Sequence, residues 1–217
     1  MLKLLRNKTE LYELGPNGRL GKSGVLPAEQ TALLQVLRAL EAENEQVNYL
    51  EIGIFGGGTT HFLKENTEKT AFFGVDLFED FVLDEKNTHV GDVFRREDVQ
   101  EFLGEHVVLY KGTSEIVLPI LPPMFDLIFI DGDHSYEATM RDFLNASKIL
   151  RGTGFLAFHN TGAYKESDNW SDDRYIQEFD GGPWRVCEQL KADPFMRFVG
   201  KVERLQVFQR LNVDFHR

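Results

Sequence analysis

Hydrophobic positions along the chain follow two different spacings, and each spacing predicts a different kind of element. Leu33, Leu37 and Leu40 recur at helical intervals after Pro27, which predicts an amphipathic helix over about residues 28–43. Short, continuously apolar runs are typical of strands that are buried on both faces. Such strands are expected at residues 47–52, 71–75, 107–110, 126–130 and 155–158. Further helices are expected at residues 59–65, 92–103, 114–120, 135–150 and 182–192.

The alternation of strands and helices predicts an α/β fold with parallel strands and right-handed crossovers. Near the end of the chain, residues 195–199 and 205–211 are two further strand-like runs, joined by the short segment 200–204. A connection of this length is typical of a hairpin, so these two strands are expected to be antiparallel. The pattern therefore predicts five strands of the βα type followed by a terminal hairpin.

Two segments fall outside this alternation. Residues 1–26 are polar and punctuated by glycines, which indicates an N-terminal arm before a single domain at residues 27–217. Such an arm can exchange between subunits, so a homo-oligomer is left open. Residues 160–181 are expected to be a long loop that roofs an acceptor pocket. Aromatic side chains there either contact an acceptor ring or anchor the loop: Tyr164, Trp170, Tyr175, Phe179 and, just beyond, Trp184.

Charge and cysteine content argue against several classes of function. The formal net charge is −11 and Lys and Arg are not clustered, which argues against binding to nucleic acid or to an anionic membrane surface. The single cysteine, Cys187, cannot form an intrachain disulfide or a zinc cage. With neither a signal peptide nor a membrane-spanning run in the printed sequence, a cytoplasmic protein is expected.

The ends of the first two predicted strands carry the first candidate ligand site. The first strand leads into Glu51-Ile-Gly-Ile-Phe-Gly-Gly-Gly-Thr-Thr60, a glycine turn that lets backbone approach a ligand. Its spacing fits neither the dinucleotide fingerprint nor the P-loop, and Glu51 would repel a pyrophosphate but suit a cation. Asp76 ends the second strand about 20 residues later, where a carboxylate can accept both ribose hydroxyls. The glycine turn with Glu51, taken together with Asp76, favours a positively charged nucleoside as the ligand.

The ends of two later strands add ionisable groups. Asp131, Asp133 and His134 follow the fourth strand, within the segment Phe-Asp-Leu-Ile-Phe-Ile-Asp-Gly-Asp-His-Ser-Tyr-Glu. His159 and Asn160 follow the fifth strand. A single histidine is more often structural than catalytic, but parallel strands end at the same edge of a sheet. The convergence of these groups therefore favours an active site over separate turn and capping roles.

Together these segments resemble class I S-adenosylmethionine-dependent methyltransferases, and they are most similar to methyltransferase family 24. That small O-methyltransferase-like group resembles catechol and macrolide-sugar O-methyltransferases and the cephalosporin hydroxylase proteins. The resemblance covers roughly residues 47–160, and more loosely residues 183–185. The matching positions are Glu51, Gly53, Gly57, Thr59, Asp76, Asp126, Asp131, Gly132, His134, Tyr136, Asp142 and His159.

The resemblance implies a doubly wound, mostly parallel, Rossmann-like sheet of seven strands in the order 3-2-1-4-5-7-6, with an antiparallel C-terminal hairpin strand. It also implies a methyltransferase that uses S-adenosylmethionine, acting on an oxygen of a small-molecule acceptor. The residues implied to bind the cofactor are Glu51, Gly53, Gly57, Gly58, Thr59, Asp76, Leu77, Thr113, Ser114 and Asp131. Of these, Glu51 and Gly53 would line the methionine half, and Asp76 would hold the ribose.

Two catalytic arrangements follow from the resemblance and stay open at this point. Asp131 would face the methyl-transfer centre, with His134 or His159 as the general base. Alternatively, Mg²⁺ or another divalent metal on Asp131, Asp133 and Asn160 would acidify the acceptor hydroxyl. Related members often have Asp where this chain has Asn160, and an amide adds no charge to a metal site.

Two other functions are weighed against methyl transfer. The first is a module that binds S-adenosylmethionine without transferase activity. The second is a hydroxylase-like or NAD-dependent oxidoreductase on the same fold. The departure from the dinucleotide fingerprint argues against NAD, and the sequence shows no clear set of two histidines and one carboxylate for iron.

Overall fold

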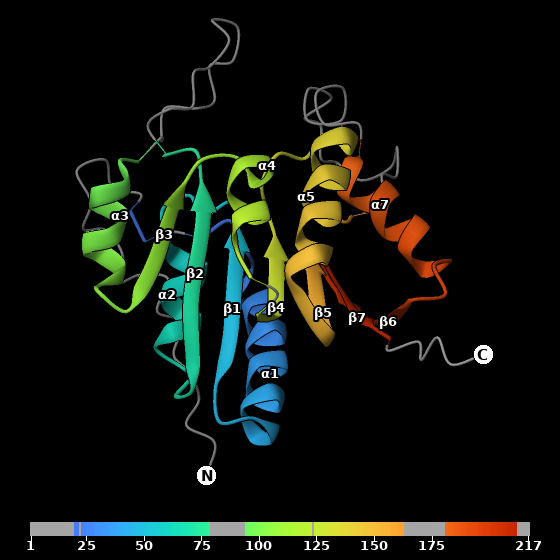
Figure 1. Ribbon diagram of the computed structural model, residues 1–217, viewed down its shortest axis with the longest axis horizontal. Helices are drawn as coiled ribbons and strands as arrows, with labels where there is room; N and C mark the ends of the chain where they lie inside the picture. Colours follow the sequence, from blue (N-terminus) through green and yellow to red (C-terminus); the bar gives the residue numbers. More distant parts are fainter. Residues whose placement is uncertain (1–19, 22, 79–93, 123, 163–180, 212–217) are drawn as a thin grey trace, which may run out of the picture.

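The computed structural model describes residues 20–21, 23–78, 94–122, 124–162 and 181–211. Seven strands within these residues form one sheet in the order β3-β2-β1-β4-β5-β7-β6, the predicted order (Figure 1). Strands β1 to β5 are parallel to one another, and β7 is antiparallel to both β5 and β6, which confirms the predicted hairpin. The strands are β1 (Val47–Ile52), β2 (Thr70–Asp76), β3 (Val107–Lys111), β4 (Phe125–Ile130), β5 (Leu150–Phe158), β6 (Met196–Val202) and β7 (Leu205–Arg210).

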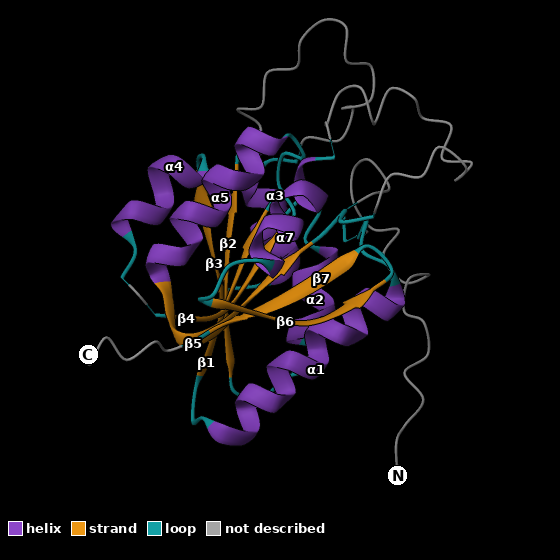
Figure 2. Cartoon of the chain, turned by 90° about the vertical axis from the view of Figure 1, so that its right-hand side faces the viewer, coloured by secondary structure: helices purple, strands orange, loops and turns teal. Residues whose placement is uncertain are grey.

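Helices cover both faces of the sheet, as Figure 2 shows from the side. One face carries α1 (Pro27–Glu43), α2 (Gly58–Lys64) and α3 (Arg96–Leu103), which share one hydrophobic core with the sheet. The other face carries α4 (Ser114–Val117), the 3-10 helix η3 (Leu118–Ile120), α5 (Tyr136–Ile149) and α7 (Gly182–Lys191), over a second core. Among the described helices, none is long and apolar enough to cross a membrane.

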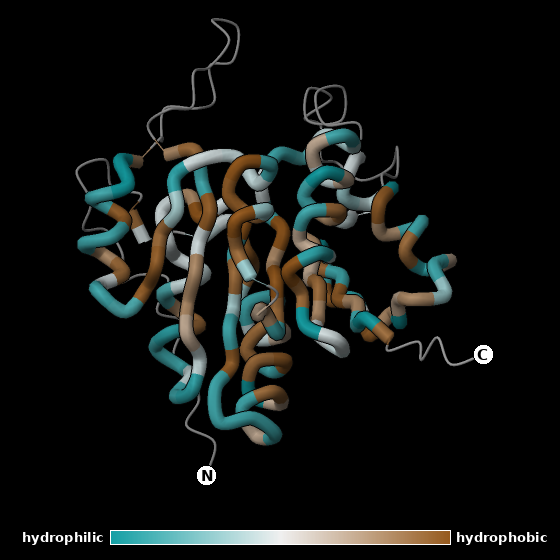
Figure 3. Tube along the Cα trace, viewed as in Figure 1, coloured by the Kyte–Doolittle hydropathy of each residue, from teal (hydrophilic) through white to brown (hydrophobic). Residues whose placement is uncertain are grey.

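Burial explains why these segments adopt these elements. All six residues of β1 and all six of β4 are buried, and β4 is hydrophobic along most of its length in Figure 3. On α1, the periodic side chains of Leu33 and Leu37 are fully buried against the sheet. Each such side chain contributes roughly 1.5–3 kcal/mol on burial. The helical and strand periodicities in the sequence therefore reflect the two cores directly.

The structure corrects the predicted bounds of several elements. Strand β5 begins at Leu150, directly after α5, and not at residue 155. The sequence did not predict the first residues of this strand, because residues 151–153 are exposed and interrupt the apolar run. Strand β6 continues to Val202, so the hairpin turn shrinks to residues 203–204. Helix α3 begins at Arg96; residues 92–93 of the predicted helix lie outside the described residues.

Candidate functional site

Strand register aligns four site residues in one row at the carboxyl edge of the sheet. Ile52 pairs with both Val75 and Ile130, and Ile130 pairs with Phe158. The backbone continues this row by one residue on each strand, because Asp131 N–H donates to the Ile52 carbonyl and His159 N–H donates to the Ile130 carbonyl. In the strand order β2-β1-β4-β5, the row reads Asp76, Gly53, Asp131 and His159. The predicted convergence of these residues is confirmed.

Two glycines of the turn after β1 have separate reasons to be glycine. Gly53 has φ +90°, and a Cβ atom there would lie 2.2 Å from the carbonyl oxygen of Asp131. The chain can therefore pass the end of β4 only without a side chain at this position. Gly57 also has a positive φ, and a Cβ atom there would press on Leu103 of α3. Its missing side chain thus serves packing against α3, a reason that the sequence did not reveal.

Glu51 is buried beneath the carboxyl edge, with 2% of its surface exposed. Its Oε2 accepts hydrogen bonds from the Thr60 hydroxyl (2.6 Å) and the Tyr49 hydroxyl (3.1 Å). Burial, assisted by the negative charges of Asp131 and Asp76, raises the pKa of Glu51 to about 8. Two neutral hydroxyls do not compensate for a buried charge, so Glu51 is mostly protonated at neutral pH, and a cation at this edge of the sheet would favour its ionised form.

Asp76 ties the turn after β1 to the turn after β2. Its Oδ2 accepts from the N–H of Phe55 (2.9 Å), and its Oδ1 accepts from the N–H of Phe78 (3.0 Å). Phe55 and Phe78 both have positive φ, which is uncommon for bulky residues and marks a backbone held by its surroundings. The Asp76 carboxylate therefore fixes both turns while its remaining lone pairs stay available to a ligand.

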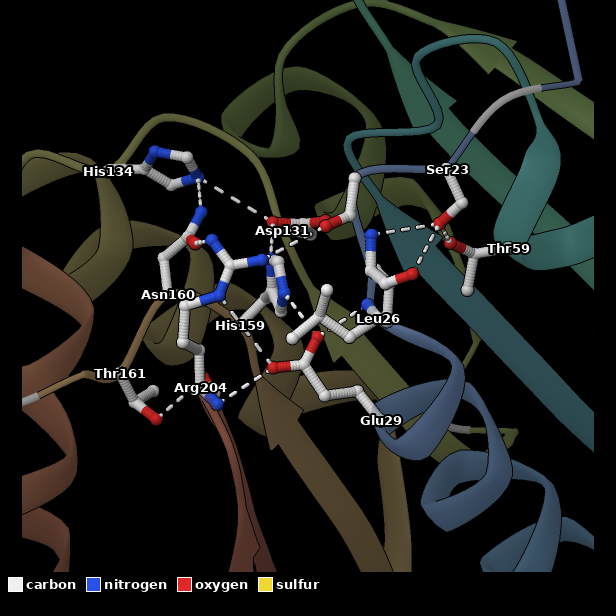
Figure 4. Close-up of polar contacts among 12 residues, drawn as sticks. Ser23, Leu26, Glu29, Thr59, Asp131, His134, His159, Asn160, Thr161 and Arg204 are labelled. Atoms are coloured by element: carbon white, nitrogen blue, oxygen red, sulfur yellow. Dashed lines mark hydrogen bonds and ion pairs between the residues drawn. The ribbon is translucent and has the colours of Figure 1, made fainter. Parts of the chain in front are cut away.

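A buried histidine joins two carboxylates that are far apart in the sequence (Figure 4). His159 Nδ1 lies 2.9 Å from Asp131 Oδ1, and its Nε2 lies 3.0 Å from Glu29 Oε2. The exposed fractions of the His159 and Glu29 side chains are 3% and 0%, and that of Asp131 is 17%. Since a carboxylate can only accept, the imidazole donates to both sides and is positively charged.

The pKa values follow from this arrangement. Burial alone would lower the pKa of His159, but its hydrogen bonds to Asp131 and Glu29 raise it to about 9. Burial alone would raise the pKa of Asp131, but the two neighbouring histidines, His134 and His159, hold it below its usual range. The pKa of Glu29 is likewise lowered: hydrogen bonds from His159 and two backbone N–H groups outweigh burial. At neutral pH the trio therefore holds one positive and two negative charges.

A second chain of contacts leads to His134. The Arg204 guanidinium donates to Asn160 Oδ1 (3.3 Å), which leaves Asn160 Nδ2 facing His134 Nε2 at 2.8 Å (Figure 4). An amide nitrogen can only donate, so His134 Nε2 acts as the acceptor and carries a lone pair. The same nitrogen lies 3.6 Å from Asp131 Oδ1. The His134 side chain is 20% exposed, so it is more accessible than His159.

Other predicted site residues have different partners. Asp133 is exposed, and its Oδ1 accepts the Ser135 N–H (2.7 Å) at the start of α5. The Ser114 hydroxyl donates to Asp142 of α5, and exposed Thr113 is the N-cap of α4. Gly58 is buried at the start of α2, and Leu77 is half-buried after β2. Among the residues that the structure describes, no group of three or more His, Cys, Asp and Glu is placed to hold a metal ion.

The N-terminal segment contributes residues that the sequence analysis missed. Gly21 N–H donates to the carbonyl of Gly56 in the glycine turn (2.7 Å), and the Ser23 hydroxyl shares a hydrogen bond with Thr59 (2.7 Å). Glu29 lies in the first turn of α1, where its Oε2 also accepts the Leu26 N–H (2.7 Å). A glutamate two residues after Pro27 is a recognisable N-terminal capping signal, but nothing local shows that it also reaches His159.

The predicted loop over the acceptor lies mostly outside the described residues, including Tyr164, Trp170, Tyr175 and Phe179. Trp184 is described and is half-buried in the first turn of α7. That turn packs tightly on the start of α5, since a Cβ atom at Gly182 would lie 2.4 Å from the carbonyl oxygen of His134. The start of α7 therefore borders the histidine side of the site.

The model of a family described as a methyltransferase domain matches residues 50–161, more than half of the chain. A viral relative, the uncharacterized protein R132 of Acanthamoeba polyphaga mimivirus, is 28% identical over 127 residues. That alignment covers 58% of this chain and 56% of the viral protein, so the chain matches little more than half of that relative's length.

Two solved structures share the fold. One is an O-methyltransferase from Bacillus cereus in complex with SAH, with 21% identity, a TM-score of 0.63, and coverage of 95% of this chain and 91% of that chain. The other is the SAH-bound methyltransferase PaMTH1 of Podospora anserina, with 17% identity, a TM-score of 0.64, and coverage of 95% and 88%. At these identities the likeness establishes a common architecture.

The His159 arrangement predicts a pH-dependent stability. Its pKa of about 9 in the folded chain exceeds the value of 6.5 in the unfolded chain. The stability that His159 contributes is therefore complete below pH 6.5 and is lost as pH rises through 9. The expected loss approaches about 3 kcal/mol between about pH 6 and pH 10, measured as the difference in unfolding free energy between wild type and His159→Gln.

If that variant does not fold, an NMR titration of the His159 imidazole in wild type gives the same information. A midpoint near 9 is expected. A midpoint near the ordinary value of 6.5, or equal losses of stability in wild type and variant, would contradict the assignment.

Proposed function

Because this chain belongs to the methyltransferase-domain family, we propose that it transfers the methyl group of S-adenosylmethionine to a hydroxyl oxygen of a small molecule. The observation that carries the proposal is the group of carboxylates at the sheet edge, where Asp76, Glu51 and Asp131 lie at or next to the ends of neighbouring strands. Burial, together with the negative charges of Asp131 and Asp76, raises the pKa of Glu51 to about 8, and a positively charged ligand would favour its ionised form.

The residues present fit the cofactor. Asp76 and the backbone of the glycine turn face the same edge, which suits a nucleoside whose ribose hydroxyls donate to a carboxylate. Asp131, and Glu51 once it ionises, supply the negative charge that a sulfonium and an ammonium group would need. When bound, S-adenosylmethionine supplies an electrophilic methyl group whose bonding pair to sulfur stays on sulfur as the methyl leaves.

The acceptor hydroxyl must lose its proton as the new carbon–oxygen bond forms. We assign that proton to His134 Nε2, which carries a lone pair and lies on the accessible side of Asp131. Asn160 occupies this lone pair in the present arrangement, and an incoming hydroxyl takes its place. Asp131 then lies within 3.6 Å of the same nitrogen and stabilises the imidazolium that forms.

His159 is less suited to the role of base. Both of its ring nitrogens donate to carboxylates, and its pKa of about 9 keeps it protonated at neutral pH. Asp131 has a lowered pKa and is accordingly a weak base. We assign His159 and Asp131 to stabilising and orienting the groups at the site, and the proton transfer to His134.

The proposed metal set does not fit a divalent ion in this arrangement. Asp133 is engaged at the start of α5, and the oxygen of Asn160 accepts from the guanidinium of Arg204. Asp131 already faces the positive charge of His159, which would repel a metal ion. The proton transfer is therefore assigned to His134 without a metal ion.

Binding and product formation test the proposed function together. Calorimetry with S-adenosylmethionine and with S-adenosylhomocysteine (SAH) is expected to show one site per chain for each. Mass spectrometry of a panel of phenols, catechols and sugar hydroxyls, each mixed with enzyme and S-adenosylmethionine, is expected to show addition of one methyl group to an oxygen. Activity that survives chelation would agree with the metal-free assignment.

Other outcomes distinguish the alternatives. Binding of both cofactor forms without any methylated product would favour a binding module. Failure to bind either form, together with binding of NAD, would overturn the proposal in favour of an oxidoreductase. Loss of activity on chelation, with recovery on adding Mg²⁺, would overturn only the assignment of the base.

Substitution of His134 tests its role directly. His134→Gln is expected to lower kcat by about 100- to 10,000-fold, the range typical of a lost general base. The Kd for SAH should stay unchanged, because the side chain removed acts on the acceptor. His106→Gln is the matched control, since His106 is exposed just before β3 and lies outside the row of site residues. A variant of His134 with wild-type kcat would rule this residue out as the base.

A further inference from the structure

We propose that Glu29 is a positioning residue for the methyl transfer, because its one carboxylate holds both chains of contacts that reach Asp131 and His134. The inference rests on the proposed function and assigns a role to a residue that lies before the segment matched by the family model. Its basis is the pair of oxygens of Glu29, each of which is committed to a different part of the site.

The first chain runs through Oε2. This oxygen accepts from His159 Nε2 at 3.0 Å, and the opposite nitrogen of the same ring lies 2.9 Å from Asp131. A ring held at both nitrogens cannot rotate, so His159 is a fixed hydrogen-bond partner for the Asp131 carboxylate. Glu29 therefore sets the orientation of a group beside the reaction centre without contacting it.

The second chain runs through Oε1. This oxygen accepts the backbone N–H of Arg204 at 2.7 Å, in the two-residue turn between β6 and β7. The Arg204 side chain then reaches Asn160 Oδ1 (3.3 Å) and the carbonyl of Gly24 (3.1 Å). Asn160 in turn fixes His134 through its amide nitrogen (Figure 4). The same carboxylate thus helps to hold the hairpin turn beside the proposed base, together with Thr161, whose N–H and hydroxyl both donate to the Arg204 carbonyl (2.8 Å each).

Burial of the Glu29 carboxylate destabilises the fold unless hydrogen bonds and cations compensate its charge. Glu29 is fully buried, although a solvent-exposed side chain would be enough to cap α1. The charged groups that face it are the His159 imidazolium, directly after β5, and the Arg204 guanidinium, whose Nε lies 3.9 Å from Oε1. A buried carboxylate with two cationic neighbours on different elements is typical of a residue that fixes geometry.

The chain offers a matched control on the same helix. Glu41 also accepts backbone N–H groups with one carboxylate, from Glu68 (3.1 Å) and Lys69 (2.7 Å), but at the opposite end of the sheet. Glu29→Gln and Glu41→Gln both remove a charge that anchors backbone to α1, so both are expected to unfold at a lower temperature. A purely structural role for Glu29 predicts that the two variants behave alike in every other respect.

The test measures the imidazole nitrogen chemical shifts of His159 and His134 by NMR at one pH, together with the kinetics of methyl transfer. Glu29→Gln is expected to shift the imidazole nitrogen signals of both His159 and His134, whereas Glu41→Gln shifts neither. Arg204→Gln keeps the backbone N–H that Glu29 holds, so it is expected to shift His134 alone. In the methyl-transfer assay, Glu29→Gln should lower kcat by about tenfold or more while the KM for S-adenosylmethionine changes by less than about twofold.

Unchanged histidine signals in a folded Glu29→Gln variant would overturn the proposal, as would equal kinetic effects of the Glu29 and Glu41 variants. If Glu29→Gln does not fold, Glu29→Asp withdraws the carboxylate by one methylene and is judged by the same signals. SAH binding by wild type is measured alongside. Its absence would contradict the proposed function, while the NMR result would still decide whether Glu29 orients the histidines.

Discussion

The structure depends on how buried carboxylates are compensated at one edge of the sheet. A carboxylate removed from water is strongly destabilising unless hydrogen bonds or cations replace its hydration. Asp131 and Glu29 are compensated from within the chain, because one protonated histidine, His159, lies between them. Glu51 has only two hydroxyls as partners, and its pKa is raised to about 8. The carboxylates on the side proposed for the acceptor thus share a cation from within the chain, whereas the side proposed for the cofactor is short of positive charge.

The topology accounts for this division. Parallel strands end at a common edge, so the register of β2, β1, β4 and β5 brings Asp76, Gly53, Asp131 and His159 level. Strand β7 runs the opposite way beside β5, so its beginning, and with it the hairpin turn, lies at the same edge. The first turn of helix α1 lies at the same edge, where Glu29 contacts His159. Glu29, near the start of the chain, and Arg204, near its end, therefore reach His159 and Asn160 directly from a helix and from a short turn.

The sequence predicted what depends on local patterns. The apolar runs located all seven strands, and the residues that end them located the row of site residues, because strand ends and sheet edge are linked by simple geometry. The start of β5 escaped because residues 151–153 are exposed and interrupt the apolar pattern. Glu29 and Arg204 escaped for a different reason: their partners are 130 and 44 residues away for the contacts to His159 and Asn160. Such pairings follow from the packing of α1 and of the hairpin, which no local pattern encodes.

The central claim is that the carboxylate edge accepts a positively charged nucleoside, and proton linkage tests it most directly. Calorimetry at about pH 7, in buffers that differ in ionisation enthalpy, measures the protons released on binding. S-adenosylmethionine should drive Glu51 to ionise and release up to about one proton, because a sulfonium lowers a neighbouring carboxyl pKa. SAH lacks the sulfonium charge and should release distinctly fewer protons. Equal proton release for the two ligands would contradict the account, since it would show that the buried carboxylate does not sense the charge of the sulfur.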